Sequence, residues 1–136
     1  MTGKLTIYTD GGARGNPGPA AVGVVIYGSG ERPIRQISEY IGNATNNQAE
    51  YKALIRGLNE AALLDAKELL CFLDSELVVR QLIGKYKVKE PELKTLIAEV
   101  LRLSNKFLRV DFKHVLRAKN KLADKLVNEA LDKAGS

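Results

Sequence analysis

The sequence predicts a single α/β domain with a mixed β-sheet, and two observations lead to that prediction. The first is a change of period along the chain: three segments with strand-like composition come first, and helical spacing alternates with short apolar strands afterwards. The second is size, because 136 residues, of which 45% are hydrophobic, are enough to bury one core. No internal repeat, low-complexity tract or linker divides the sequence. We therefore expect one domain over residues 1–136.

The first three elements are predicted to be the strands of an antiparallel meander. Residues 4–10 alternate apolar and polar side chains and end at Asp10, and residues 20–27 are small, β-branched and aromatic. Residues 34–41 form the third segment, and the glycines and proline before it favour a tight turn. Short links between consecutive strands are typical of antiparallel pairing.

Helical spacing begins at Gln48 and continues to Leu64, with small and apolar residues on one face. Thr45 and Gln48 fit a capping box at its start. Residues 69–74 form a continuous apolar run that ends in Asp74, which favours an interior parallel strand. The remaining elements are predicted to be a helix over residues 76–83 with Ser75 as its N-cap, a helix that begins at Pro91, a strand over residues 107–115 and a helix over residues 120–134.

Composition excludes several classes of protein. No stretch approaches the 18 consecutive apolar residues of a membrane span, and the first residues lack the apolar run of a secretory signal. A single cysteine, Cys71, allows neither an intramolecular disulfide nor a zinc cluster. We therefore expect a cytoplasmic protein without a membrane partner.

The net charge of +5 is unevenly divided along the chain. Residues 80–125 contain 13 basic and five acidic side chains, so this segment carries +8 and the remainder carries −3. A basic segment favours a polyanionic partner, nucleic acid first, while solvated helix faces are the alternative explanation.

Four acidic residues stand where apolar residues are expected. Asp10 and Asp74 end apolar strands, Glu50 lies on the apolar stripe of its helix, and Asp124 lies at the edge of the stripe of the last helix. Carboxylates brought close together raise one another's pKa unless cations neutralise them. Hard divalent cations prefer carboxylate oxygens, so this set favours Mg²⁺ or Mn²⁺ over zinc.

Each acidic residue also has a purely structural explanation. Glu50 could cap its helix with Asn47, and Asp10 could be a turn residue before two glycines. Asp74 with Ser75 could form an Asx-type entry to the next helix, and Asp124 could pair with Lys121. The glycine-rich loop over residues 10–19 lacks the spacing of a nucleotide-binding loop, and a tight turn that lets the backbone approach a ligand fits it better.

Four segments together resemble type 1 ribonuclease H, the endonuclease that cuts RNA in RNA–DNA hybrids. They are Tyr8-Thr-Asp10-Gly-Gly-Ala-Arg-Gly-Asn-Pro-Gly-Pro19, Thr45-Asn-Asn-Gln-Ala-Glu50, Leu73-Asp74-Ser75, and His114-Val-Leu-Arg117 with Ala123-Asp124. They occur in the family's order along the whole chain. The resemblance implies an RNase H-like fold: a five-stranded mixed sheet, three strands antiparallel and then two parallel, flanked by helices.

The resemblance also implies the chemistry. Asp10, Glu50, Asp74 and Asp124 would bind two Mg²⁺ ions, for which Mn²⁺ can substitute; one would activate the attacking water and the other would stabilise the leaving 3′ oxygen. The products would carry 5′-phosphate and 3′-hydroxyl ends. The alternatives are a catalytically silent module that binds hybrid or RNA, and a nuclease of the same fold that acts on double-stranded RNA or branched DNA.

By the same resemblance, residues beside the carboxylates would contact the hybrid, whose 2′-hydroxyls distinguish RNA from DNA. The expected substrate contacts are Gly11, Gly12, Asn16, Asn46, Asn47 and Ser75, with Lys85, Lys87 and Lys89 holding the phosphate backbone. Asn46 and Asn47 could instead serve as helix caps.

The auxiliary catalytic residue of the family has two candidates. His114 stands ten residues before Asp124, as the family's histidine does, but alternation places it on the face of Phe112, where a buried structural histidine is the alternative. Arg117, in the loop before the last helix, is the competitor.

The chain departs from the family in three ways. Position 76 is Glu where many relatives have Gln, the short segment 84–90 leaves no room for a long basic helix, and no separate hybrid-binding domain is evident. The expected partner is RNA–DNA hybrid, with double-stranded RNA as a further candidate, and we expect a monomer without an obligate protein partner.

Overall fold

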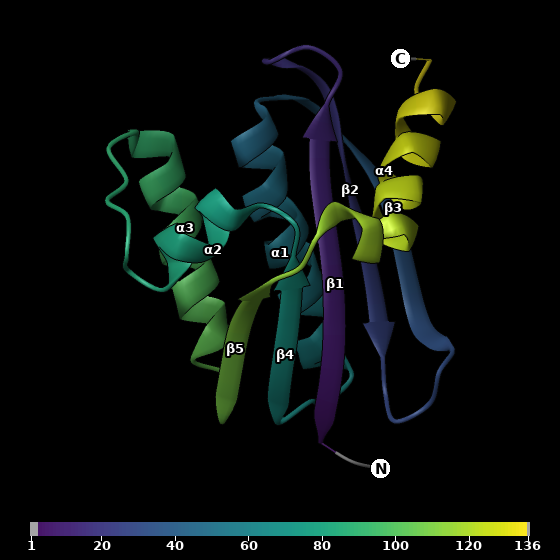
Figure 1. The fold of residues 1–136 in the computed structure, drawn as a ribbon, viewed down its shortest axis with the longest axis vertical. Helices are drawn as coiled ribbons and strands as arrows, with labels where there is room; N and C mark the ends of the chain where they lie inside the picture. Colours follow the sequence, from purple (N-terminus) through teal and green to yellow (C-terminus); the bar gives the residue numbers. More distant parts are fainter. Residues whose placement is uncertain (1–2, 136) are drawn as a thin grey trace.

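A central sheet of five strands organises the molecule (Figure 1). The computed structural model describes residues 3–135, so residues 1, 2 and 136 of the predicted domain lie outside the described residues. In spatial order the strands are β3 (Pro33–Ala44), β2 (Gly18–Tyr27), β1 (Lys4–Ala13), β4 (Glu68–Leu73) and β5 (Arg109–His114). Neighbours among the first three pair antiparallel, whereas β1–β4 and β4–β5 pair parallel.

Helices cover the two faces of the sheet unequally. They are α1 (Asn46–Leu63), α2 (Glu76–Leu82), α3 (Pro91–Ser104), α4 (Lys121–Lys133) and a 3₁₀ turn, η1 (Arg117–Lys119). Helices α1, α2 and α3 lie behind the sheet in Figure 1, while α4 packs on the opposite face over β2 and β3. The face of β1, β4 and β5 that is turned toward the viewer therefore carries no helix along most of its length. We call it the open face.

The predicted mixed sheet and the order of strands and helices are confirmed, with η1 as the one added element in the described residues. Strand β1 differs from its prediction because it continues three residues beyond Asp10. Its parallel pairing with β4 stops at Thr9↔Leu73, but its antiparallel pairing with β2 continues to Ala13↔Ala20. Asp10 thus leaves the parallel ladder while it is still held rigidly by β2.

The main core lies between the sheet and α1, where Ile7, Leu54 and Leu58 are fully buried. A smaller core under α4 includes Val25 and Leu126. No helix within residues 3–135 is long and apolar enough to cross a membrane. Most of the buried side chains are apolar, and the buried acids Asp10 and Glu50 are exceptions.

The capping box at the start of α1 is confirmed. The Thr45 hydroxyl accepts from the Gln48 N–H at 3.1 Å, and the Gln48 side chain accepts from the Thr45 N–H at 2.9 Å. Glu50 is therefore not a capping residue with Asn47, because Thr45 and Gln48 already satisfy this end of the helix. The carboxylate of Glu50 is free to serve another purpose.

Helix α4 lies so close to β2 that only glycine fits at position 23. A Cβ at Gly23 would lie 2.2 Å from the carbonyl oxygen of Ala123, a backbone atom that cannot move aside alone. We expect Gly23→Ala to lower the free energy of unfolding by about 1–3 kcal/mol in urea denaturation, because α4 must shift. Gly30→Ala is the matched control, since no atom lies within 4 Å of a Cβ there. Equal stability of the two variants would contradict the close packing of α4.

Candidate active site

The end of the parallel pairing between β1 and β4 brings Asp10 and Asp74 to the same level of the sheet. Thr9↔Leu73 is the last parallel pair between β1 and β4, and each aspartate is the next residue in its chain segment. Asp10 is 5% exposed, and Asp74 is half-buried. The predicted strand-end position is confirmed for Asp74, whereas Asp10 lies within β1, just past the end of its parallel pairing with β4.

Glu50 reaches the same place from α1, because the start of that helix touches β1. A Cβ at Gly11 would lie 2.1 Å from the carbonyl oxygen of Ala49, so the strand and helix backbones are in direct contact. The Gly11 N–H donates to Glu50 Oε1 at 2.7 Å. As a result, one carboxylate oxygen from each of Asp10, Glu50 and Asp74 lies within 4.8 Å of the others.

Asp124 approaches this cluster from the first turn of α4. Its negative charge is close enough to contribute to the raised pKa of Asp10. The Asn128 amide donates to the Asp124 carbonyl oxygen at 3.1 Å and to its Oδ2 at 3.5 Å. Arg14 donates to Asn128 Oδ1 at 3.3 Å, so a chain of polar contacts links the β1–β2 loop to Asp124.

The electrostatics of the cluster are unfavourable for four negative charges. Burial, followed by the charges of Asp74 and Asp124, raises the pKa of Asp10 from 3.8 to about 7. Burial and the charge of Asp10 raise the pKa of Glu50 well above its usual value, although the Gly11 N–H opposes this. None of the salt bridges formed within residues 3–135 includes these acids, and Asp124 does not pair with Lys121.

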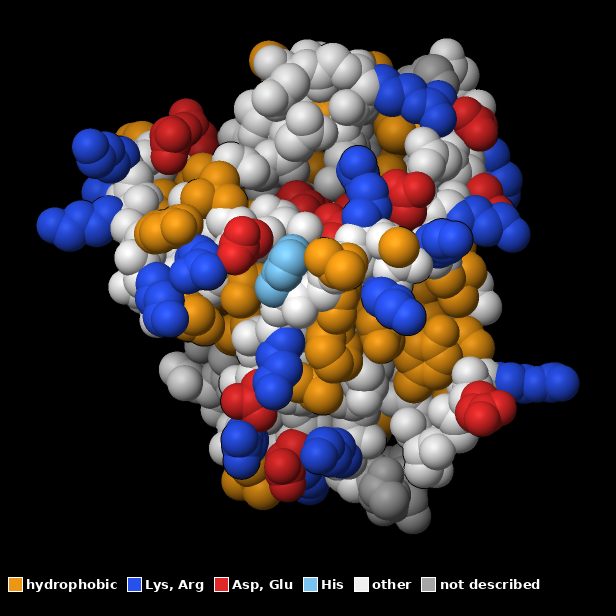
Figure 2. Space-filling view, in the orientation of Figure 1, with side chains coloured by type: hydrophobic (Ala, Val, Ile, Leu, Met, Phe, Trp, Pro, Cys, Tyr) orange, Lys and Arg blue, Asp and Glu red, His pale blue; other side chains and the backbone are white. Residues whose placement is uncertain are grey.

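The four acids line one cleft of about 340 Å³ together with most of the predicted site residues. Figure 2, in the orientation of Figure 1, shows acidic side chains recessed in a hollow in the upper part of the molecule, with basic side chains beside the hollow. From the predicted set the cleft contains Asp10, Gly11, Gly12, Asn46, Asn47, Glu50, Asp74, Ser75, Arg117 and Asp124.

A second cleft of about 450 Å³ adjoins the first at Asn46 and Asn47 and also contains Asn16. Asn46 Oδ1 accepts from the Ala13 N–H at 2.9 Å, and the Asn46 N–H donates to Asn16 Oδ1 at 3.0 Å. These contacts fix the β1–β2 loop against α1. The helix-cap explanation for Asn46 and Asn47 is wrong, because Thr45 is the N-cap.

The other predicted residues lie outside both clefts. His114 ends the edge strand β5 and is exposed, so the alternative of a buried structural histidine is wrong, although Phe112, two residues earlier, packs against the core. Lys85, Lys87 and Lys89 are exposed on the loop between α2 and α3.

Glu76 is exposed at the start of α2 and pairs with Arg80 at 2.8 Å. A hydrogen bond from Arg80 lowers its pKa, and the charge of His114 adds to the effect.

Asn120 is a site residue that the sequence did not reveal. It is 2% exposed, and its Nδ2 donates to the Thr9 carbonyl at 2.9 Å and to Asp74 Oδ2 at 3.0 Å. An asparagine just before a helix predicts an N-cap, yet this side chain makes no capping bond. Asn120 instead fastens the start of α4 to the ends of β1 and β4.

Comparison with known proteins gives matches along nearly the whole chain. A family model described as "Reverse transcriptase-like" matches residues 8–130. The "Bifunctional protein Rv2228c" of Mycobacterium tuberculosis is 44% identical over 132 residues, which are 96% of this chain but 36% of that protein. The chain thus spans about a third of the length of this relative.

Solved structures give a fuller match. RNase H1 from the halophilic archaeon Halobacterium salinarum is 42% identical, with a TM-score of 0.93 over 96% of this chain and 98% of that one. LC11-RNase H1, isolated from compost by a metagenomic approach, was solved in complex with an RNA/DNA hybrid; it is 48% identical, with a TM-score of 0.92 over 97% of this chain and 99% of that one. With these matches, and with the five-stranded mixed sheet and its carboxylate cluster, the chain belongs to the type 1 ribonuclease H family.

Proposed function

We propose that this chain hydrolyses the RNA strand of RNA–DNA hybrids with two Mg²⁺ ions, leaving 5′-phosphate and 3′-hydroxyl ends, and that it acts as a monomer. The observation that carries the proposal is the convergence of Asp10, Glu50 and Asp74, whose carboxylate oxygens lie within 4.8 Å of one another. The hybrid bound to LC11-RNase H1, which is 48% identical, supports the substrate. A monomer suffices because one chain supplies every carboxylate.

The residues present fit divalent cations. The site offers only oxygen ligands and is partly buried, and burial together with the charges of Asp74 and Asp124 raises the pKa of Asp10 to about 7. Asp10, Glu50, Asp74 and Asp124 would hold the ions. Bound divalent cations supply Lewis acidity to water and to the phosphate oxygens.

The protein's own groups then have distinct tasks. The Gly11 N–H orients Glu50, and the Asn120 amide orients Asp74. Arg117 is exposed and lines the acidic cleft, so it is the better placed of the two auxiliary candidates to contact a phosphate. Asn16, Asn46 and Asn47 offer amides along the adjoining cleft, where 2′-hydroxyls can be recognised.

The proposed activity is tested with three substrates of equal length: RNA–DNA hybrid, duplex RNA and duplex DNA. We expect Mg²⁺-dependent internal cleavage of the RNA strand of the hybrid, with 5′-phosphate products. Asp10→Asn and Asp74→Asn should each lower the rate by at least about 10³-fold, because each removes a charged metal ligand. Asn59→Asp, on the exposed face of α1, is a control for added charge and should retain full activity.

The outcomes separate the alternatives. Hybrid binding without cleavage would indicate a silent binding module, and preferred cleavage of duplex RNA would indicate a same-fold nuclease with another substrate. Cleavage that persists in excess EDTA would exclude the metal-dependent mechanism.

The raised pKa of Asp10 makes a second prediction, about stability. The pKa of Asp10 is about 7 in the folded chain, against an ordinary value of 3.8. Between these two pH values the folded chain keeps a proton on Asp10 that the unfolded chain has lost. The contribution of this group to the free energy of unfolding therefore falls as the pH rises through that range. In EDTA at pH 8 we expect Asp10→Asn to raise the melting temperature by about 5 °C, with the gain shrinking toward pH 4. Added Mg²⁺ should stabilise the parent protein more than the variant. A lower melting temperature for Asp10→Asn at pH 8 would contradict this prediction.

Asn120 yields a third prediction. Asn120→Asp replaces an amide donor, 3.0 Å from Asp74 Oδ2, with another carboxylate. We expect it to lower cleavage at fixed Mg²⁺ by about 10- to 100-fold, because disturbed outer-shell partners weaken metal sites. A Mg²⁺ titration of the rate measures the effect, again with Asn59→Asp as the matched control. Equal Mg²⁺ dependence in both variants would show that Asn120 has no part in holding Asp74.

A further inference from the structure

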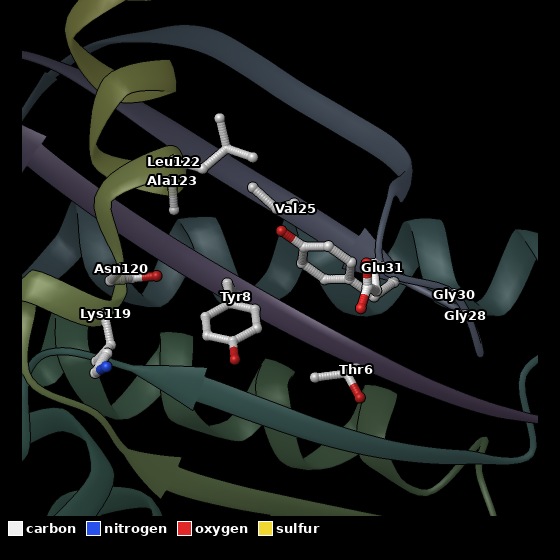
Figure 3. Close-up of a pocket in the computed structure, with 11 residues that line it drawn as sticks. Thr6, Tyr8, Val25, Gly28, Gly30, Glu31, Lys119, Asn120, Leu122 and Ala123 are labelled. Carbon is white, nitrogen blue, oxygen red and sulfur yellow. The ribbon is translucent and has the colours of Figure 1, made fainter.

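A groove of about 430 Å³ lies on the open face, separate from the acidic cleft. Figure 3 shows it bounded by the start of α4 on one side and by the β2–β3 turn on the other, with Tyr8 on its floor. Lys119 and Asn120 stand at one end, and Glu31 stands at the other. Tyr8, Tyr27 and Lys119 are among the residues that line it.

Strand register places aromatic side chains directly beneath the carboxylates. Tyr8 and Asp10 are two residues apart within β1, so their side chains share a face at about 7 Å along the strand, and Phe72 lies two residues before Asp74, next to the end of β4. Tyr8 and Phe72 are register partners whose rings stack with centroids 5.0 Å apart, and Tyr27 meets Tyr8 edge to face at 5.8 Å. All three are half-buried, so part of the aromatic cluster faces solvent.

The groove and the acidic cleft are joined by one segment, residues 115–120, which crosses the open face between β5 and α4 (Figure 1). Arg117 lines the acidic cleft, and Lys119, two residues later, lines the groove. Both side chains are exposed, and Leu116 between the strand and η1 is 69% exposed. Lys113, register partner of Phe72, adds a further exposed cation on the open face. Figure 2 shows an apolar patch in this region with basic side chains beside it.

We propose that this groove binds an unpaired nucleotide of a single strand that continues from the hybrid in the acidic cleft. The base would contact Tyr8 and Tyr27, and its phosphate would lie near Lys119. Aromatic side chains beside cations are the usual means of binding single-stranded nucleic acid, because every base offers a flat apolar face. A paired strand cannot fill the groove in this way, since its bases are stacked within the duplex.

This inference rests on the proposed function, since it assigns the cleft to the hybrid and the groove to the strand beyond it. The short distance supports that continuity: Tyr8 and Asp10 are two residues apart on β1, and Phe72 is two residues before Asp74 in the sequence. A single nucleotide step can therefore reach from one to the other.

The test compares the binding of a blunt hybrid with that of the same hybrid carrying a five-nucleotide single-stranded extension at either end of either strand. Binding is measured by fluorescence anisotropy with the Asp10→Asn variant in Mg²⁺, so that the substrate is not cut. We expect at least one extension to tighten binding by about fivefold or more. Tyr27→Leu and Lys119→Glu should each remove most of that gain while leaving blunt-hybrid binding within about twofold.

Matched controls are Tyr40→Leu, at an exposed tyrosine on β3, and Lys106→Glu, at an exposed lysine beyond α3. Both should keep the gain from the extension. To check folding, chains that keep Asp10 and carry only Tyr27→Leu or only Lys119→Glu should cleave blunt hybrid at the normal rate.

Equal binding of blunt and extended hybrids would overturn the proposal, as would a gain that survives both groove variants. Saturable binding of a free nucleoside monophosphate, with no gain from any extension, would assign the groove to free nucleotides and overturn it too. Failure of the wild-type chain to cleave blunt hybrid would instead count against the proposed function, and the two failures are therefore distinguishable.

Discussion

Repulsion between buried carboxylates is the constraint on which the rest of this structure depends. Three acids with oxygens within 4.8 Å of one another, and a fourth nearby, oppose the folded state wherever they are ionised. The stability of the folded state must therefore come from the packing of the rest of the domain. Direct backbone contact at Gly11 holds α1 against β1, and close contact at Gly23 holds α4 against β2. The two helices that carry Glu50 and Asp124 are thus fixed by steric fit and apolar burial.

The groups that orient the acids are neutral, which follows from the same constraint. Glu50 accepts from a backbone N–H, Asp74 accepts from Asn120, and Asp124 lies beside the amide of Asn128. A lysine or arginine in any of these places would neutralise a carboxylate and compete with a divalent cation for it. Amide donors fix the orientation of a carboxylate without neutralising its negative charge. The site therefore stays negative, and its stability depends on protons or on added cations, as the raised pKa of Asp10 expresses.

Local pattern was sufficient to predict the strands, the helices and the acids, because a carboxylate at an apolar position contradicts the period around it. Local pattern could not predict contacts between segments that are distant in the sequence. Asn120 contacts Thr9 across 111 positions, and an asparagine before a helix is ordinarily interpreted as its cap. The exposure of His114 could not be predicted for a related reason: alternation gives the face of a strand, but it does not tell how far burial extends along that face. Strand β1 ran past Asp10 because its two neighbours end at different levels.

The division of charge along the chain gains a spatial meaning from the fold. Three of the four acids come from the part of the sequence with a net charge of −3, while the segment 80–125 with +8 supplies Asp124 and the exposed cations. Those cations are not gathered around the acids: the lysines between α2 and α3 lie to one side, Lys113 and Lys119 lie on the open face, and Arg117 alone among them lines the acidic cleft. Because exposed charges are screened within about 10 Å, each group would act on the phosphate nearest to it in the proposed complex. Under the proposed function, such an arrangement would hold the hybrid at several points along its length and leave the carboxylates free for metal.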